Sequence, residues 1–157
     1  MLKKLFATES VDPVLSLGLL ILRAGVGGPI FFAHGMAKAR QIDLFTDFVS
    51  RHVISTGASV LGWAMVGAEI VCSALVIAGL ATRLAVLPLI GVMLLALCVI
   101  HLHGNWSASK ELSLVYLVVL LALLCTGAGR YSLDALLCRR READAVEPAS
   151  ANNEVNS

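Results

Sequence analysis

The sequence predicts an all-α integral membrane protein, folded as a four-helix bundle. The composition is the first observation that predicts it: 58% of the 157 residues are hydrophobic and only 15% are charged, which is too apolar for a small soluble domain. The second is that the apolar residues gather in four long runs, each close to the roughly 20 residues that cross a bilayer. The third is that short polar or glycine-containing segments separate these runs.

The four expected spans cover residues 14–36, 59–80, 84–103 and 110–127. Together they form one membrane domain, residues 14–137. A short head (residues 1–13) precedes it, and a basic and then disordered tail (residues 138–157) follows it. In the first span, Pro29 follows two glycines and is expected to bend the helix, because proline cannot donate the helical hydrogen bond.

The sizeable loop between the first two spans, residues 37–58, contains an amphipathic pattern. Four of its side chains recur at helical spacing on one face: Leu44, Phe45, Phe48 and His52. Asp47 and Arg51 lie four residues apart on another face. The pattern predicts a short helix at the membrane interface. A lid over a cavity is the alternative interpretation.

Charge predicts the orientation, because cytoplasmic segments of membrane proteins are enriched in lysine and arginine. Four spans place both termini on one side. If that side is the inside, the inner segments carry seven basic residues: Lys3, Lys4, Arg83, Arg130, Arg139, Arg140 and Arg141. The outer segments carry four: Lys38, Arg40, Arg51 and Lys110. We therefore expect a multi-pass protein of a bacterial inner membrane with both termini in the cytoplasm.

Two charged residues fall inside the spans, where a charge is costly unless it is paired. Arg23 lies nine residues from the inner end of the first span, and Glu69 eleven residues from the inner end of the second. Antiparallel neighbours would bring them to similar depth, within about 5 Å. We therefore predict a buried ion pair between Arg23 and Glu69. It is either a structural link between the two helices or a site that handles protons or a ligand.

Polar residues also collect at the predicted outer ends of the spans. They are the candidate ligand-binding residues: His34, Lys38, His101, His103 and Glu111. Three imidazoles and a carboxylate suit a metal, a haem iron or the headgroup of a quinone, in the last case within an open polar cavity. Ordinary interfacial residues that reach water are the other interpretation. His101 and His103 point about 200° apart on a continuous helix, which disfavours a metal site, and we predict none.

Several classes of protein are disfavoured. The net charge is +1 and no basic patch with interleaved aromatic residues is present, so nucleic acid is not an expected partner. Four scattered cysteines include no C-x-x-C pair, which argues against a thiol–disulfide centre or a cysteine zinc site. No Rossmann glycine pattern is present, so the residues themselves indicate no cofactor.

A series of short motifs resembles the DoxX family of small four-helix membrane proteins. The motifs are Leu22-Arg23, His34-Gly35-x-x-Lys38, Gly67-x-Glu69, the turn at residues 79–83 (GLATR) and the segment at residues 127–134 (GAGRYSLD). Their order and spacing carry the resemblance, which covers about residues 14–137. It implies family positions at Arg23, His34, Lys38, Glu69 and Arg83. The loop at residues 37–58 is longer and more polar than a minimal member would need.

The resemblance implies a redox-associated membrane subunit that binds a quinone or another amphipathic ligand near the outer leaflet. Members of the family are linked to quinone-coupled thiosulfate oxidation and to membrane oxidoreductase complexes. Any enzymatic role would then be that of one subunit in a membrane oxidoreductase. The expected partners are the lipid bilayer and other subunits of such a complex, and self-association is also compatible with the resemblance. The alternatives are a non-catalytic scaffold or assembly subunit and, less favoured because paired broken helices are absent, a small transporter.

Reporter fusions test the predicted orientation. Fusions after Gly57 and after Ser107 are expected to report a periplasmic position, and a fusion at Ser157 a cytoplasmic one, because four spans return the chain to its starting side. Paired alkaline phosphatase and fluorescent-protein reporters provide the measurement. A cytoplasmic signal at Gly57 would contradict the orientation.

Overall fold

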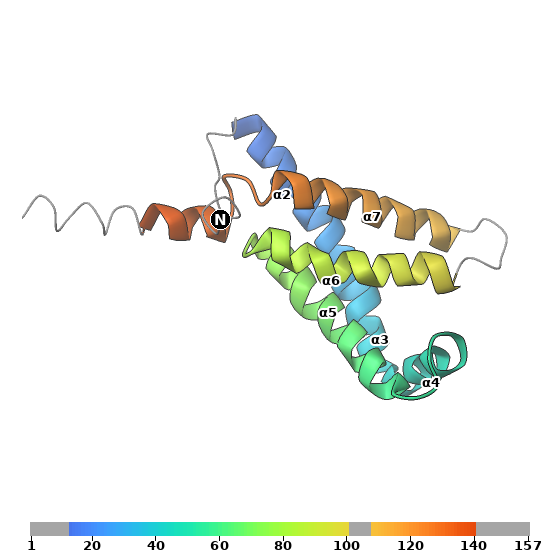
Figure 1. The fold of residues 1–157 in the computed structure, drawn as a ribbon. Helices are drawn as coiled ribbons and strands as arrows, with labels where there is room; N and C mark the ends of the chain where they lie inside the picture. The colour runs from blue at the N-terminus through green and yellow to red at the C-terminus, as the bar shows by residue number, and fades with distance from the viewer. Residues whose placement is uncertain (1–12, 101–107, 141–157) are drawn as a thin grey trace, which may run out of the picture.

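The computed structural model describes residues 13–100 and 108–140. In this part of the chain every regular element is a helix. Figure 1 shows the long helices packed against one another, with the short helix α4 at the end where α3 meets α5. The all-α class that the sequence predicts is therefore confirmed for the described residues.

The first helix is continuous but changes type along its length. It begins as α2 (Pro13–Pro29), continues as the π-helical segment η1 (Ile30–Met36) and ends as α3 (Ala37–Arg40). The change to the wider π-helix comes directly after Pro29, whose missing N–H interrupts the regular ladder of α-helical hydrogen bonds. Where the sequence predicts a bend, the structure has a change of helix type, and the helix continues four residues past the predicted end at Met36.

The remaining elements follow in order: α4 (Ile42–His52), α5 (Ala58–Ala78), α6 (Thr82–Leu95), η2 (Ala96–Ile100), α7 (Ala108–Thr126) and a final helical segment at residues 133–140. The predicted head, residues 101–107 and most of the predicted tail lie outside the described residues. Gly79 ends α5 in the left-handed conformation (φ +71°), which a glycine adopts without steric cost and which satisfies the carbonyls of the last turn.

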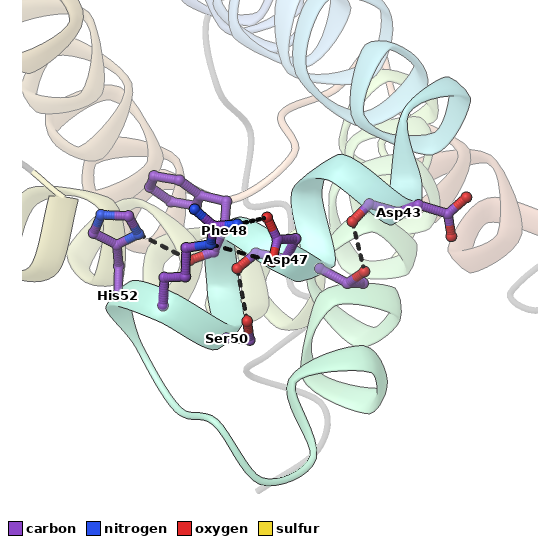
Figure 2. Close-up of polar contacts among 7 residues, drawn as sticks. Asp43, Asp47, Phe48, Ser50 and His52 are labelled. Carbon is purple, nitrogen blue, oxygen red and sulfur yellow. Dashed lines mark hydrogen bonds and ion pairs between the residues drawn. The ribbon is translucent and has the colours of Figure 1, made fainter.

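Helix α4 confirms the predicted amphipathic helix between the first two spans. Its Val49 is buried, and Thr46 packs against Gly62 at the start of α5. The helix also carries short-range polar contacts (Figure 2): Ser50 Oγ donates to Asp47 O at 2.8 Å, and Arg51 pairs with the Asp47 carboxylate at 2.8 Å. Because these contacts are local and exposed, they stabilise the helix itself by only about 0.5 kcal/mol each.

The surface of the described residues is strongly apolar. Many large aliphatic side chains are more than half exposed, including Val14 at 81%, Val60 at 76% and Val118 at 58%. Two helices, Pro13–Arg40 and Ala58–Ala78, are long and apolar enough to cross a bilayer, and a shorter apolar helix covers Thr82–Cys98. Such a surface suits hydrocarbon rather than water.

Glycines set the register between the first helix and α5. A Cβ at Gly27 would lie 2.6 Å from Ile77 Cγ1, and one at Gly35 would lie 2.8 Å from Ile70 Cγ1. The two helices therefore approach closely at both points, as small residues allow in membrane helices. This antiparallel register places Gly35 beside Glu69 and leaves the start of α2 beyond the end of α5.

Substitution of Gly27 tests this close approach. Gly27→Ala should be less stable than Gly25→Ala by about 1–3 kcal/mol, because the new methyl group overlaps Ile77 and meets the Ser73 carbonyl oxygen at 3.3 Å. Gly25 is a matched control on the same helix, since a Cβ there meets nothing within 4 Å and alanine favours helix. Unfolding by detergent titration gives both values, and equal stabilities would refute the register.

Candidate functional site

A lysine and a buried glutamate form an ion pair between the first helix and α5. Lys38 Nζ lies 2.5 Å from Glu69 Oε1. The glutamate side chain is fully buried, whereas the lysine side chain is 26% exposed. Lys38 Nζ also lies 5.0 Å from the ring centroid of Phe45, over its face. The ammonium group is therefore stabilised by a carboxylate and by the π-electrons of an aromatic ring.

The carboxylate of Glu69 is only partly satisfied. Its second oxygen, Oε2, is buried and has no hydrogen-bond partner among the described residues. One turn further along α5, the hydroxyl of Ser73 donates to the backbone carbonyl of Glu69. A buried oxygen without a donor is costly, so the ion pair with Lys38 is the main stabilising contact of this carboxylate among the described residues.

His34 lies within the π-helical segment, one turn before Lys38. Its ring meets Tyr116 of α7 edge to face, with ring centroids 5.7 Å apart and planes at 87°. The imidazole is half-buried. π-helical turns often occur at functional sites, because the extra residue in the turn redirects the side chains around it. Here the turn directs His34 toward α7, and Lys38 reaches α5.

A groove of about 380 Å³ opens beside Lys38, between α3 and α4. Its walls are largely apolar or aromatic, and its lining residues are Ala37, Lys38, Gln41, Leu44, Phe45 and Phe48. A largely apolar groove with one basic side chain and one amide is a composition that suits an amphipathic molecule with one polar end. We call this groove, together with Glu69, the Lys38 site.

Arg23 forms a second polar centre, at the end where α5 turns into α6. The side chain is fully buried, and its Nη2 donates a hydrogen bond to the backbone carbonyl of Tyr131. A Cβ at Gly79 would overlap Nη1 of Arg23, so only glycine fits there. The nearby carboxylate of Asp134 attracts the guanidinium. Nε and Nη1 have no hydrogen-bond partner among the described residues.

Two loops meet around Arg23. Asp134 Oδ1 accepts a hydrogen bond from the N–H of Ala81 at 3.0 Å, and the N–H of Asp134 donates to the Gly79 carbonyl at 3.1 Å. Ala81 has a positive φ of 46°, which is strained for alanine. The hydrogen bond from its N–H to a carboxylate stabilises that conformation. The motif turn at 79–83 and the motif segment at 127–134 thus form one joint.

The predicted pair between Arg23 and Glu69 does not form. Glu69 pairs with Lys38, and Arg23 binds the Tyr131 carbonyl beside Asp134. The depth estimate assumes that the inner ends of the two helices are level, but the start of α2 projects past the end of α5. Arg23 is therefore level with Gly79, ten residues beyond Glu69, or about 15 Å along the helix.

The other candidate residues are only partly brought together. His34 lies within one turn of Lys38 in the first helix. Glu111 is exposed in the first turn of α7. His101 and His103 lie outside the described residues. Within the described ranges, no three His, Cys, Asp or Glu side chains converge on one point in the manner of metal ligands.

The interpretation of the sequence missed two partners. The sequence prediction places Lys38 at the outer end of the first span and not beside Glu69. Its place in the His34-Gly35-x-x-Lys38 motif was the available signal that Lys38 has a specific role. The partner of Arg23 is a backbone carbonyl, which any residue supplies, so no pattern of side chains could identify it.

Comparisons with known proteins show which family the chain resembles. The family model described as DoxX matches residues 18–102. A protein of Haemophilus influenzae, described as an uncharacterized protein, is 30% identical over 125 residues, which cover 76% of this chain and 82% of that protein. No solved structure matches the chain.

A double-mutant cycle distinguishes the two pairings of Glu69. Lys38→Met and Glu69→Leu should show a coupling of about 1–3 kcal/mol, because the two charges are in contact, whereas Arg23→Met and Glu69→Leu should be additive within about 0.5 kcal/mol. Lys38→Met should be the more damaging single change of the first pair, at about 3–5 kcal/mol, because it leaves a fully buried carboxylate unpaired. Unfolding in mixed micelles gives the energies. Coupling confined to Arg23 would contradict the pairing described above.

Proposed function

Because the chain belongs to the DoxX family of membrane proteins, we propose that it is a multi-pass four-helix bundle of a bacterial inner membrane with both termini in the cytoplasm. We further propose that it is a redox-associated subunit that binds a quinone or another amphipathic molecule in the Lys38 site. The observation that carries this proposal is the position of Lys38, which contacts the buried Glu69 and also lines an apolar groove.

The chemistry of Lys38 suits a carbonyl-bearing headgroup. An ammonium group has three N–H donors, and the ion pair with Glu69 uses one of them. The side chain is 26% exposed, so a ligand in the groove can reach the remaining donors. A quinone presents carbonyl oxygens as acceptors for these N–H groups.

The walls of the groove suit the rest of such a ligand. Leu44 is 69% exposed, and Phe45 and Phe48 lie beside it in the lining. These side chains offer aromatic and aliphatic contact to a planar ring and its hydrocarbon tail. Because α4 supplies three of the lining residues, it would serve as one wall of the site, which is the lid interpretation of this helix.

A non-catalytic scaffold is the second candidate function. The observation that favours it is that Lys38 and Glu69 already neutralise each other and join α3 to α5 without any ligand. A need to fix how two helices dock is enough to account for a pair of this kind. In that case the protein would hold partner subunits of an oxidoreductase complex, and the groove would contain lipid.

Extraction of bound quinone separates the two functions. Protein purified in mild detergent should retain quinone above the level of the surrounding membrane lipid. Phe48→Ala should lower the affinity of the protein for quinone about 10-fold, because a partly buried phenyl group in contact with a ligand contributes about that factor to binding. Phe32→Ala is the matched control, because Phe32 lies on η1, is 70% exposed and does not line the groove.

The readout is quinone per protein by chromatography of the solvent extract. Equal retention in the two phenylalanine variants would place any quinone elsewhere. Wild-type protein with no quinone above the membrane background would reject the ligand-binding function and leave the scaffold.

A further inference from the structure

A second groove lies at the opposite end of the molecule from the Lys38 site. It has a volume of about 460 Å³ and lies where the segment after α7 passes the end of α5. Its lining includes Arg130, Tyr131, Ser132, Leu133, Leu136 and Arg139. Neither the redox-associated function nor the Lys38 site accounts for it. Figure 1 shows the helical segment at 133–140 leaving the packed helices at this end.

The groove is positively charged. Arg130 and Arg139 are both exposed and form no ion pair within the described residues. Arg23 lies beneath the wall, where it binds the carbonyl of Tyr131. The nearby carboxylate is that of Asp134, which is buried and directed at the N–H of Ala81 rather than into the groove. The arrangement therefore favours an anion that two guanidinium groups can contact together.

The same groove has an apolar side. Leu133 is 44% exposed and Leu136 is 57% exposed, and both line it. Leu136 and Arg139 lie one helical turn apart, so a charged and an aliphatic contact are available to one bound molecule. Leu137, at 52% exposure, extends the apolar surface of this segment. A free phosphate ion would use only the arginines, whereas a phospholipid would use both kinds of side chain.

We propose that this groove binds an anionic phospholipid. The phosphate groups would lie between Arg130 and Arg139, and the acyl chains would run along Leu133 and Leu136. Basic pockets between transmembrane helices bind the headgroups of anionic lipids through their lysine and arginine side chains. A bound lipid would also hold the segment at 133–140 at the membrane surface, next to the joint that surrounds Arg23.

Native mass spectrometry of the full-length, delipidated protein tests the proposal. The probes are dioleoyl phosphatidylglycerol, which is anionic, and dioleoyl phosphatidylcholine, which is zwitterionic and has the same acyl chains. Wild-type protein should bind the anionic lipid at least about 10-fold more tightly. Arg130→Gln and Arg139→Gln should each weaken that binding about fivefold, because each removes one arginine contact with the lipid. The double variant should weaken it about 25-fold.

Arg140→Gln is the matched control. Arg140 is exposed on the same helical segment as Arg139 but does not line the groove. Its substitution removes the same charge as Arg139→Gln. It should change the affinity for phosphatidylglycerol less than twofold. Arg139→Lys should restore part of the loss, because the positive charge returns without the fork of donors. Gel filtration and circular dichroism establish that each variant is folded.

Three results would overturn the proposal. Equal losses in Arg139→Gln and Arg140→Gln would show diffuse attraction to charge instead of a site. Equal affinity for the two lipids would remove the requirement for an anion. Displacement of phosphatidylglycerol by inorganic phosphate at similar concentration would show a site for the free ion, with no part for the leucines.

Discussion

The fully buried guanidinium of Arg23 is the constraint on which the rest of this structure depends. On insertion scales, an arginine at the centre of a membrane helix costs about 3 kcal/mol. Here a backbone carbonyl and a nearby carboxylate offset that cost, and both come from the segment after α7. Gly79 must lack a side chain to admit the guanidinium. Helix α2, the α5–α6 turn and the segment after α7 therefore meet at one side chain.

The first helix carries two cations with opposite surroundings. Arg23 is enclosed by polypeptide, whereas Lys38 is partly open to a groove. The helix changes to π geometry between them, directly after Pro29. One cation is therefore suited to holding the fold together and the other to meeting a ligand. The family motifs include both, so a shared motif position does not by itself indicate a shared role.

Much of the fold could be predicted from the sequence, because long apolar runs, glycines and prolines act over short distances. The helical class and the amphipathic helix α4 followed from such local patterns. The partner of Glu69 did not, because a register between two helices depends on where close packing occurs. Gly27 and Gly35 set that register through contacts with Ile77 and Ile70. In this register the start of α2 extends past the end of α5, which places Lys38 rather than Arg23 beside Glu69.

The candidate site was predictable in its residues more than in its geometry. Glu69 stands out as a charge inside a span, and His34 and Lys38 stand out as polar residues at the outer end of the first span; of these, Lys38 and Glu69 are in contact. The role of Phe45 and Phe48 as a groove wall depends on how α4 folds back on α3, which a helical repeat alone does not specify. The joint around Ala81 was hidden for a different reason: most of its hydrogen bonds involve backbone groups, which no side-chain pattern reveals.

The contact between Arg23 and Tyr131 also bears on how the protein is made. The two residues are 108 positions apart, so at about 5–20 residues per second the ribosome supplies the acceptor roughly 5–20 s after the donor. During that interval the guanidinium has neither Tyr131 nor Asp134 as a neighbour. Its burial by these partners waits until the segment after α7 has been made. Helix α2 is made before α5, α6 and α7 but reaches its final surroundings only after them, so translation order and assembly order differ in this part of the chain.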